Sequence, residues 1–389
     1  MQIDFHYYAA YCAAILAGYS HEESLAVAYA NQFTDHCSRT LLKKLKAPLS
    51  AATTQLQTEL MNEDTGILGL QNITRIWVSF HFLPGDLHAD SGVRSKRFTN
   101  KYRLICGPNG SLLTDTVELA KGRGLQAAGL AMHVLSDTWA HTYFAGTPAA
   151  VINNTNDYFY ELLPTDDGER ERKIRFIHNP AASDDFERSV YVNSIRQENE
   201  NSVMNLGHGR AGHLPDYSFV RYRYMPAWGD YRVIEKDNPS DYYRAFCQMV
   251  YALKYLRGDA ESFLPGTYDE SSVAPYEAEL HRILTVRRPD ASEDWKALGE
   301  RLSGQSIEDF DVAKYQQEYL DAAPEEKDAT FLGGYFLAAM AHKSMVTHRI
   351  FESGSLLAGF SVDYRQGGFR GNRDFKPLAK LFGEGRHDE

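Results

Sequence analysis

The stretch AMHVLSDTWAHTYFAG, residues 131–146, carries the information that decides the fold and the chemistry. His133, Asp137 and His141 follow one another at intervals of four residues. An α-helix advances about 100° per residue, so each step drifts by only ~40° and the three side chains share one face. The other positions are almost all apolar, which indicates a buried helix. Because a buried carboxylate among imidazoles must be paired or bound to metal, the pattern predicts a metal site.

Further ligand-type residues lie in unusually apolar surroundings elsewhere in the chain. For a single histidine such as His6 or His81, the simpler interpretation is a hydrogen-bonded core residue. For His133, Asp137 and His141 that preference is reversed, because three ligand-type residues share one buried helical face. Imidazole and carboxylate donors suit zinc, and also manganese or iron. The additional candidates are His6, Asp35, His36, His81, His208, His213 and Asp216.

The composition is that of a globular protein, with 43% hydrophobic and 24% charged residues. The net charge of −11 and the lack of a Lys/Arg stripe argue against stable binding of duplex nucleic acid. The first apolar run ends at Gly18 and is too short to span a bilayer, and it has no basic leader typical of a secretory signal. Four scattered cysteines are typical of reduced core thiols. We therefore expect a cytoplasmic protein, with export by another route left open and the oligomeric state undetermined.

Helical patterns dominate the chain and predict a mainly α fold, a multi-helix bundle with long functional loops. The segment 73–84 mixes β-branched and aromatic residues, and its pattern does not separate a strand from a buried helix. Residues 150–230 are expected to be irregular and, as a long loop region, functional. We expect a helical metal-binding catalytic domain over 1–260 and a helical C-terminal extension packed on it over 261–389. The tail from about 365 is Gly- and Arg-rich and is expected to be poorly ordered.

The order of these candidates resembles the zinc-dependent phospholipase C and single-strand nuclease superfamily. In that order, a histidine on the first helix and an aspartate on the second precede the His133-x3-Asp137-x3-His141 motif, and a histidine–acid pair follows it. The resemblance covers about residues 1–220. Four segments also resemble a bacterial family of unassigned function placed near that superfamily: DFHYYAAYCAAILAGYSHEES, AYANQFTDH, HVLSDTWAHTYFAG and GHGRAGHLPD.

The resemblance implies a helical protein that holds zinc ions in a cleft and hydrolyses phosphate esters. It implies two catalytic carboxylates: Asp137 bridging two ions, and Asp35 holding a metal-bound water as general base. The final histidine–acid pair would be His208 or His213 with Asp216. The metal ligands implied are His6, Asp35, His81, His133, Asp137, His141, His208 and Asp216, with His36 and His213 as further candidates.

The chain departs from the superfamily pattern in three places, which leaves two or three ions open. The interval between Asp137 and His141 is shorter. The final pair has the wrong interval if it is His213 with Asp216. In the relatives a processed N-terminal Trp gives its amine and carbonyl to a metal, whereas here Met1 comes first; Asp4 is a candidate for that role.

Clustered divalent ions activate water and hold anionic oxygens, which suits hydrolysis of a small-molecule, lipid or nucleotide phosphate ester. Tyr217, Arg221 and Arg223 are candidate substrate contacts, with a solvated aromatic-basic loop as the alternative. Two other function classes stay open: a metal-stabilised binding or structural module without catalysis, and a di-iron or di-manganese oxygenase.

Overall fold

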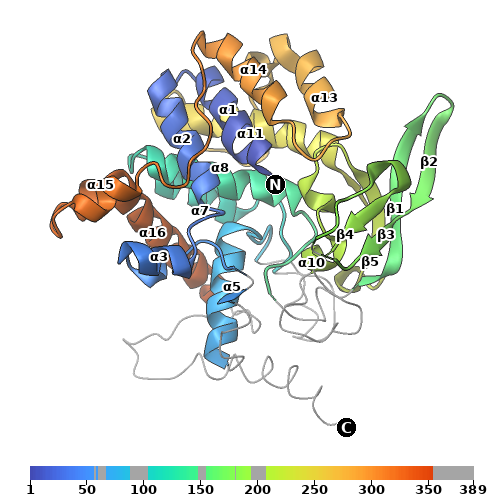
Figure 1. Ribbon diagram of the computed structural model, residues 1–389, viewed down its shortest axis with the longest axis horizontal. Helices are drawn as coiled ribbons and strands as arrows, with labels where there is room; N and C mark the ends of the chain where they lie inside the picture. The colour runs from blue at the N-terminus through green and yellow to red at the C-terminus, as the bar shows by residue number, and fades with distance from the viewer. Residues whose placement is uncertain are drawn as a thin grey trace.

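The computed structural model describes residues 1–56, 58–59, 67–87, 104–147, 155–179, 181–193 and 207–353. Figure 1 shows a helical body with the strands gathered on one side of it. The helices are α1 (Ala10–Leu16), α2 (His21–Phe33), α3 (Arg39–Leu45), α5 (Ile67–Phe80), α7 (Ser111–Ala120), α8 (Leu125–Ala140), α10 (Gly207–Ala211), α11 (Asn238–Arg257), α12 (Glu270–Val273), α13 (Glu277–Thr285), α14 (Ser292–Ser303), α15 (Gln316–Asp321) and α16 (Phe331–Glu352).

Short helical turns join these elements. A π-helical turn, η1 (Asp4–Ala9), runs directly into α1, and 3₁₀ turns include η2 (Leu49–Ala51), η3 (Phe186–Arg188) and η5 (Leu214–Asp216). The strands are β1 (Thr155–Thr165), β2 (Gly168–Lys173), β3 (Arg175–Ile177), β4 (Val190–Val192), β5 (Arg221–Pro226) and β6 (Ile234–Asp237).

The prediction of a mainly α fold is wrong, because residues 150–230 contain strands. An antiparallel sheet has the order β2-β1-β5-β6, and β3 and β4 form a parallel pair. In β5 the sequence RYRYMP alternates, with Tyr222 and Tyr224 buried and Arg221 and Arg223 facing outward. This period of two is typical of a strand. Strand β2, GERERK, has no buried residue, so hydrophobic patterning could not reveal it.

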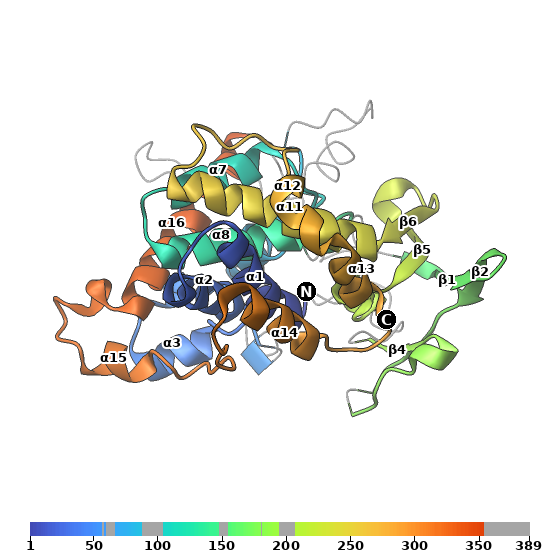
Figure 2. The same ribbon diagram turned by 90° about the horizontal axis from the view of Figure 1, so that it is seen from above.

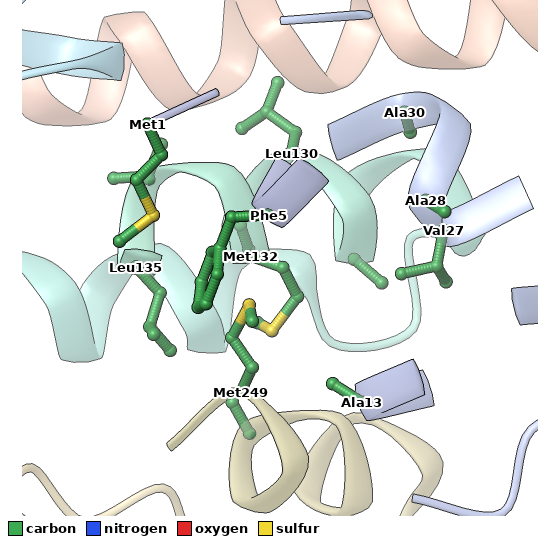
Figure 3. Close-up of a cluster of buried hydrophobic side chains, with 14 of the residues drawn as sticks. Met1, Phe5, Ala13, Val27, Ala28, Ala30, Leu130, Met132, Leu135 and Met249 are labelled. Atoms are coloured by element: carbon green, nitrogen blue, oxygen red, sulfur yellow. The ribbon is translucent and has the colours of Figure 1, made fainter. Parts of the chain in front are cut away.

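The central helix α8 is buried along most of its length. It packs against α2, α11, α16 and α7, and in Figure 2 it runs between α11 on one side and α1 and α2 on the other. Figure 3 shows part of the core, in which Met132 of α8 lies beside Phe5 and Met249. Helices from the C-terminal part share this core, since α14 packs against η1 and α1, and α16 packs against α8 and α5. The tail from 365 lies outside the described residues.

Two glycines let neighbouring segments approach α8 closely. A Cβ at Gly129 would lie 2.3 Å from the Val27 carbonyl oxygen, so only glycine permits this approach of α2 to α8. A Cβ at Gly146, in the segment that follows α8, would lie 2.8 Å from the backbone of Trp77 in α5. The ends of α2 and α5 are thereby held beside the polar face of α8.

The segment 73–84 is resolved as the end of helix α5 and the turn that follows it. Phe80 packs in the helical core, whereas Phe82 packs in a second apolar cluster beneath the sheet. Ala140, the last residue of α8, and Phe144, four residues further on, divide between the two clusters in the same way. His81 and His141 therefore lie where the two cores meet.

Candidate metal centre

Eight side chains from distant parts of the sequence converge on the polar face of α8. His133 and Asp137 lie within α8, and His141 follows its last residue. The helical segments η1, α2, α5, α10 and η5 supply the others, each within a helical turn or just after a helix ends. A π-helical turn such as η1 is uncommon and is often found at functional sites. These other side chains are His6, Asp35, His81, His208 and Asp216.

The first group of ligand atoms forms a nearly equilateral triangle. His81 Nδ1 lies 3.3 Å from His133 Nε2, and each nitrogen lies 3.2 Å from Asp137 Oδ2. Asp35 Oδ1 lies 3.8 Å from both nitrogens. Ligands that bind zinc at about 2.0–2.1 Å with tetrahedral geometry are ~3.3–3.4 Å apart, so this group has the dimensions of a metal site.

A second group surrounds one oxygen of Asp216. Its Oδ1 lies 3.2 Å from His141 Nε2 and 3.3 Å from His208 Nε2. The α-amino group of Met1 is buried and lies 3.0 Å from the same oxygen. The imidazoles of His141 and His208 meet edge to face, with ring centroids 4.7 Å apart. These three side chains also have the separations expected of ligands to one ion.

A third group forms on the other oxygen of Asp137. His6 Nε2 and the Met1 amino group each lie 3.3 Å from Asp137 Oδ1. The His6 ring stacks on the His133 ring with centroids 4.0 Å apart. Asp137, which is only 1% exposed, thus faces one group with each oxygen and is placed to bridge them.

In His81 and His141, the hydrogen bond made by the outward-facing ring nitrogen determines which nitrogen of the neutral ring carries the proton. His81 Nε2 donates to the Thr53 carbonyl at 2.9 Å, and His141 Nδ1 donates to the His81 carbonyl at 2.7 Å. A carbonyl oxygen only accepts, so these nitrogens carry the proton and a neutral ring presents a lone pair inward. Each inward nitrogen faces a carboxylate oxygen at 3.2 Å. Two lone pairs at this distance repel unless a cation or a second proton lies between them.

At several of these rings, burial disfavours the second proton that would relieve the repulsion. Burial and the neighbouring His133 lower the pKa of His6 to about 4, although Asp137 acts to raise it. Burial also lowers the pKa of His141. The pKa of His81 is raised, because its contacts with Asp137 outweigh burial. Near neutral pH, protons therefore neutralise only part of the cluster, and the residues present fit bound divalent cations.

The carboxylates and the Met1 amine keep their charges despite burial. Burial acts to raise the pKa of Asp137, but His141 and the Met1 amine outweigh it and hold that pKa well below its usual range. The pKa of Asp216 is also held well below its usual range, by the amine and His208 against burial. Burial acts to lower the pKa of the Met1 amine, yet Asp137 and Asp216 raise it to about 11. The acids are thus ionised and able to act as ligands.

The cluster is accessible from two sides. A cavity of about 890 Å³ has His208 and Asp216 in its wall. The side chain of Asp35 is 32% exposed, whereas that of Asp137 is 2% exposed. A site that small molecules can enter differs from a closed structural metal site.

The structure places the remaining ligand candidates elsewhere. Asp4 accepts hydrogen bonds from the backbone of Phe5 and Ala291 at 2.8 and 3.1 Å, so it joins η1 to α14. His36 is exposed and its ring stacks with Phe310, with centroids 5.1 Å apart. His213 belongs to none of the three ligand groups found among the described residues. Its Nδ1 lies 3.6 Å from Asp184 instead.

The candidate substrate contacts divide between two places. Arg221 and Arg223 lie on the outer face of the sheet, where both form ion pairs with Glu235 across the strands. Arg221 also pairs with Glu169, and Arg223 with Glu171. They stabilise the sheet rather than face the ligand groups. Tyr217, in contrast, lines the cavity beside Asp216.

Sequence reasoning missed three parts of the site. The Met1 amine lies in two ligand groups, and the carbonyls of Thr53 and His81 orient imidazoles. The resemblance pointed to an N-terminal amine, for which Asp4 was the candidate substitute, but backbone groups carry no residue-type signal that would place them in this chain. Asp184 in the cavity wall precedes another aspartate, Asp185, in an irregular segment, and no helical spacing in the sequence draws attention to it.

Fold and geometry together define a helix-rich α/β protein with a buried cluster of imidazoles and carboxylates at ligand distances. The chain belongs to the family of unknown function DUF6765, whose model matches residues 1–350. No curated protein and no solved structure matches the chain. Across the described residues, the structure has no helix that is long and apolar enough to cross a membrane.

Proposed function

We propose that this chain is a metal-dependent hydrolase that acts on phosphate esters and uses zinc or a similar divalent cation. One observation carries the metal: the inward nitrogens of His81 and His141 face carboxylate oxygens at 3.2 Å while their outward nitrogens donate to carbonyls. A cation between the partners converts this repulsion into coordination. Backbone carbonyls that orient ligating imidazoles are typical of metal sites.

The ligand distances support at least two ions. One is assigned to His81, His133 and the carboxylates of Asp35 and Asp137, and another to His141, His208 and Asp216. His133 Nε2 has a single lone pair and serves one ion only, although it lies near His6 as well. A third ion at His6 and Asp137 would have to displace a proton from the Met1 amine, whose pKa is raised to about 11.

The reaction class follows from the chemistry that such ions supply. Bound divalent cations lower the pKa of water and neutralise the non-bridging oxygens of a phosphate ester. Asp35 is ionised, because His133, His6 and His81 outweigh burial and lower its pKa. Since it is also partly exposed, it is the carboxylate placed to accept a proton from an attacking water. The resemblance to the phospholipase C and nuclease superfamily supports the same assignment.

Two features favour catalysis over a closed metal-stabilised module. The cavity reaches His208 and Asp216, and Asp35 is partly exposed to solvent, so substrate and water have access.

The four cysteines are buried and unpaired, which supports a reducing compartment such as the cytoplasm.

The test combines elemental analysis with turnover. The purified protein should contain zinc, or manganese or iron, at two or more ions per chain, and should hydrolyse bis(p-nitrophenyl) or p-nitrophenyl phosphate. Chelation should abolish turnover, and adding the metal back should restore it. The double variant Asp35→Asn, His133→Ala should lose metal and turnover together. Metal without turnover on either ester would contradict the hydrolase and leave a binding module, whereas iron with oxygen consumption would indicate an oxygenase.

A further inference from the structure

The cavity next to the second ligand group has the size of a small-molecule site. Its volume is about 890 Å³, within the range of ~300–1,000 Å³ common for ligand pockets. His208 and Asp216 form one part of its wall, and Asp184, His213 and Tyr217 form another. A phosphate held near the ligand groups would therefore extend its organic part into this space.

His213 lies in this wall beside Asp184 and Tyr217, which are hydrogen-bonded to each other. Asp184 accepts from the Val192 backbone at 2.5 Å and from the Tyr217 hydroxyl at 2.6 Å, so both its oxygens are fixed. His213 Nδ1 lies 3.6 Å from Asp184 and 3.5 Å from the Tyr217 hydroxyl. These contacts engage Nδ1 and leave Nε2 for another partner. The His213 side chain is 50% exposed, whereas that of Asp184 is 5% exposed.

The backbone ties this ring to the ligand groups. The carbonyl of His213 accepts from the backbone N–H groups of Asp216 and Tyr217 at 2.9 and 3.2 Å. His213 and Asp216 therefore share one rigid turn. A substrate that contacts both His213 and the ion bound at Asp216 would therefore bind to one turn of the chain with its phosphate and with its organic part.

The wall chemistry indicates what the organic part is. Gln2, Ser183 and Asn193 offer uncharged donors and acceptors, and the rings of Phe186 and Tyr217 offer flat apolar surface. Among the described residues that line the cavity there is no lysine or arginine. Such a wall suits hydroxyl groups on a compact carbon frame. It matches neither a second phosphate nor two acyl chains.

We propose that the substrate is a phosphate ester of a small hydroxylated alcohol, such as a polyol or sugar, and that His213 binds a hydroxyl of this alcohol. Asp184 is then a positioning residue that acts through His213. This inference rests on the proposed function, because it takes the phosphate to lie at the ligand groups.

The experiment compares variants of the full, metal-loaded chain with two kinds of probe. Glycerol 3-phosphate carries the hydroxyls, and p-nitrophenyl phosphate lacks them. The variants are His213→Ala and Asp184→Asn. The matched control is His281→Ala, because the His281 side chain is 51% exposed and lies 3.8 Å from a carboxylate of Glu277. Metal content, kcat and KM are measured for each, and calorimetry gives the affinity for glycerol 3-phosphate independently of turnover.

Loss of one hydrogen bond to the substrate should lower kcat/KM and affinity for glycerol 3-phosphate about tenfold in His213→Ala, mainly through KM. The same variant should change p-nitrophenyl phosphate kinetics less than about twofold and keep its metal. Asp184→Asn should show a smaller loss of the same kind, and His281→Ala none.

Three results would overturn the inference. These are equal losses on both probes, an unchanged affinity for glycerol 3-phosphate in His213→Ala, and a wild-type preference for a diacyl phospholipid over glycerol 3-phosphate. Failure of the proposed function is distinguishable, because it is the absence of turnover on every ester by metal-loaded protein. In that case the calorimetric comparison of His213→Ala with His281→Ala still decides whether the cavity binds the alcohol through His213.

Discussion

At the scale of single residues, Asp137 concentrates the chemistry of the site. Its two oxygens contact three imidazoles and the Met1 amine at 3.2–3.3 Å, although its side chain is almost fully buried. An ionised carboxylate in such a place is costly unless cations surround it. The interval of four residues in the sequence revealed His133, Asp137 and His141 as one set. It could not reveal the partners that arrive from other helices.

His342 is a buried histidine outside this cluster, and it can be used to test how burial changes the pKa of an imidazole. Its Nε2 donates to the Thr116 hydroxyl at 3.0 Å, and burial lowers its pKa to about 3. Because the folded-state pKa lies below the ordinary value of 6.5, the neutral ring stabilises the fold above about pH 6.5, and this contribution is lost as the pH falls toward 3.

We therefore expect the wild type to lose about 2 kcal/mol more unfolding free energy than His342→Gln between pH 7 and pH 5. Glutamine is chosen because its amide nitrogen can still donate to Thr116. Urea unfolding at the two pH values measures the difference. His348→Gln, on the same helix but 64% exposed, should follow the wild type. Parallel losses in wild type and His342→Gln would show that the ring is not held neutral.

At the scale of elements, close contact between helices brings ligands together. Asp35 follows α2, and α2 is held against α8 by the absence of a side chain at Gly129. His81 likewise follows α5, whose contact with the chain after α8 depends on Gly146. Helix ends therefore deliver ligands that the sequence places far apart.

Gly129→Ala should separate α2 from α8, because its Cβ would meet the Val27 carbonyl oxygen at 2.3 Å. We expect a loss of about 1–3 kcal/mol of stability, typical of overpacking, and a lower metal content as Asp35 moves away. Gly334→Ala in α16 is the control, since its nearest contact would be an ordinary 3.4 Å. Alanine there should be neutral or stabilising by up to ~1 kcal/mol. Thermal unfolding and elemental analysis measure both effects, and an unaffected Gly129→Ala would refute this role for the glycine.

The strands show where sequence reasoning at this scale fails. In β5 the alternation of arginine and tyrosine was visible, but the surrounding Asn, Asp and Arg favoured a loop. Strand β2 has no buried residue and is stabilised by cross-strand ion pairs such as Arg223 with Glu171, which depend on the register of two other strands. Long-range pairing of this kind has no local signature. Amphipathic helices such as α11 have one, because their buried residues recur at helical spacing.

At the scale of the whole molecule, the ligand groups lie where the helical core meets the apolar cluster under the sheet. The packing of the helical core against the apolar cluster under the sheet therefore depends on whether the ligand groups between them hold cations. Without cations, the inward lone pairs and carboxylates repel one another in the buried interior. Ions that bind only the folded state stabilise it by mass action, by about 4 kcal/mol when the free ion exceeds its Kd a thousandfold.

Chelation should therefore lower the melting temperature by several degrees or more, and zinc should restore it. Differential scanning calorimetry with and without a chelator measures this shift. Asp137→Asn should respond much less, because it has lost the shared ligand. A wild-type melting temperature that is indifferent to chelation would mean that the core tolerates the cluster without ions.

The most direct test of the central claim is the number of metal ions per chain in wild type and Asp137→Asn, measured by inductively coupled plasma mass spectrometry. Wild type should hold two or more ions, and Asp137→Asn should hold at least one fewer, since asparagine keeps the shape of the side chain but not its charge. A metal-free wild type after purification and incubation with zinc would contradict the account. So would an Asp137→Asn variant that keeps every ion.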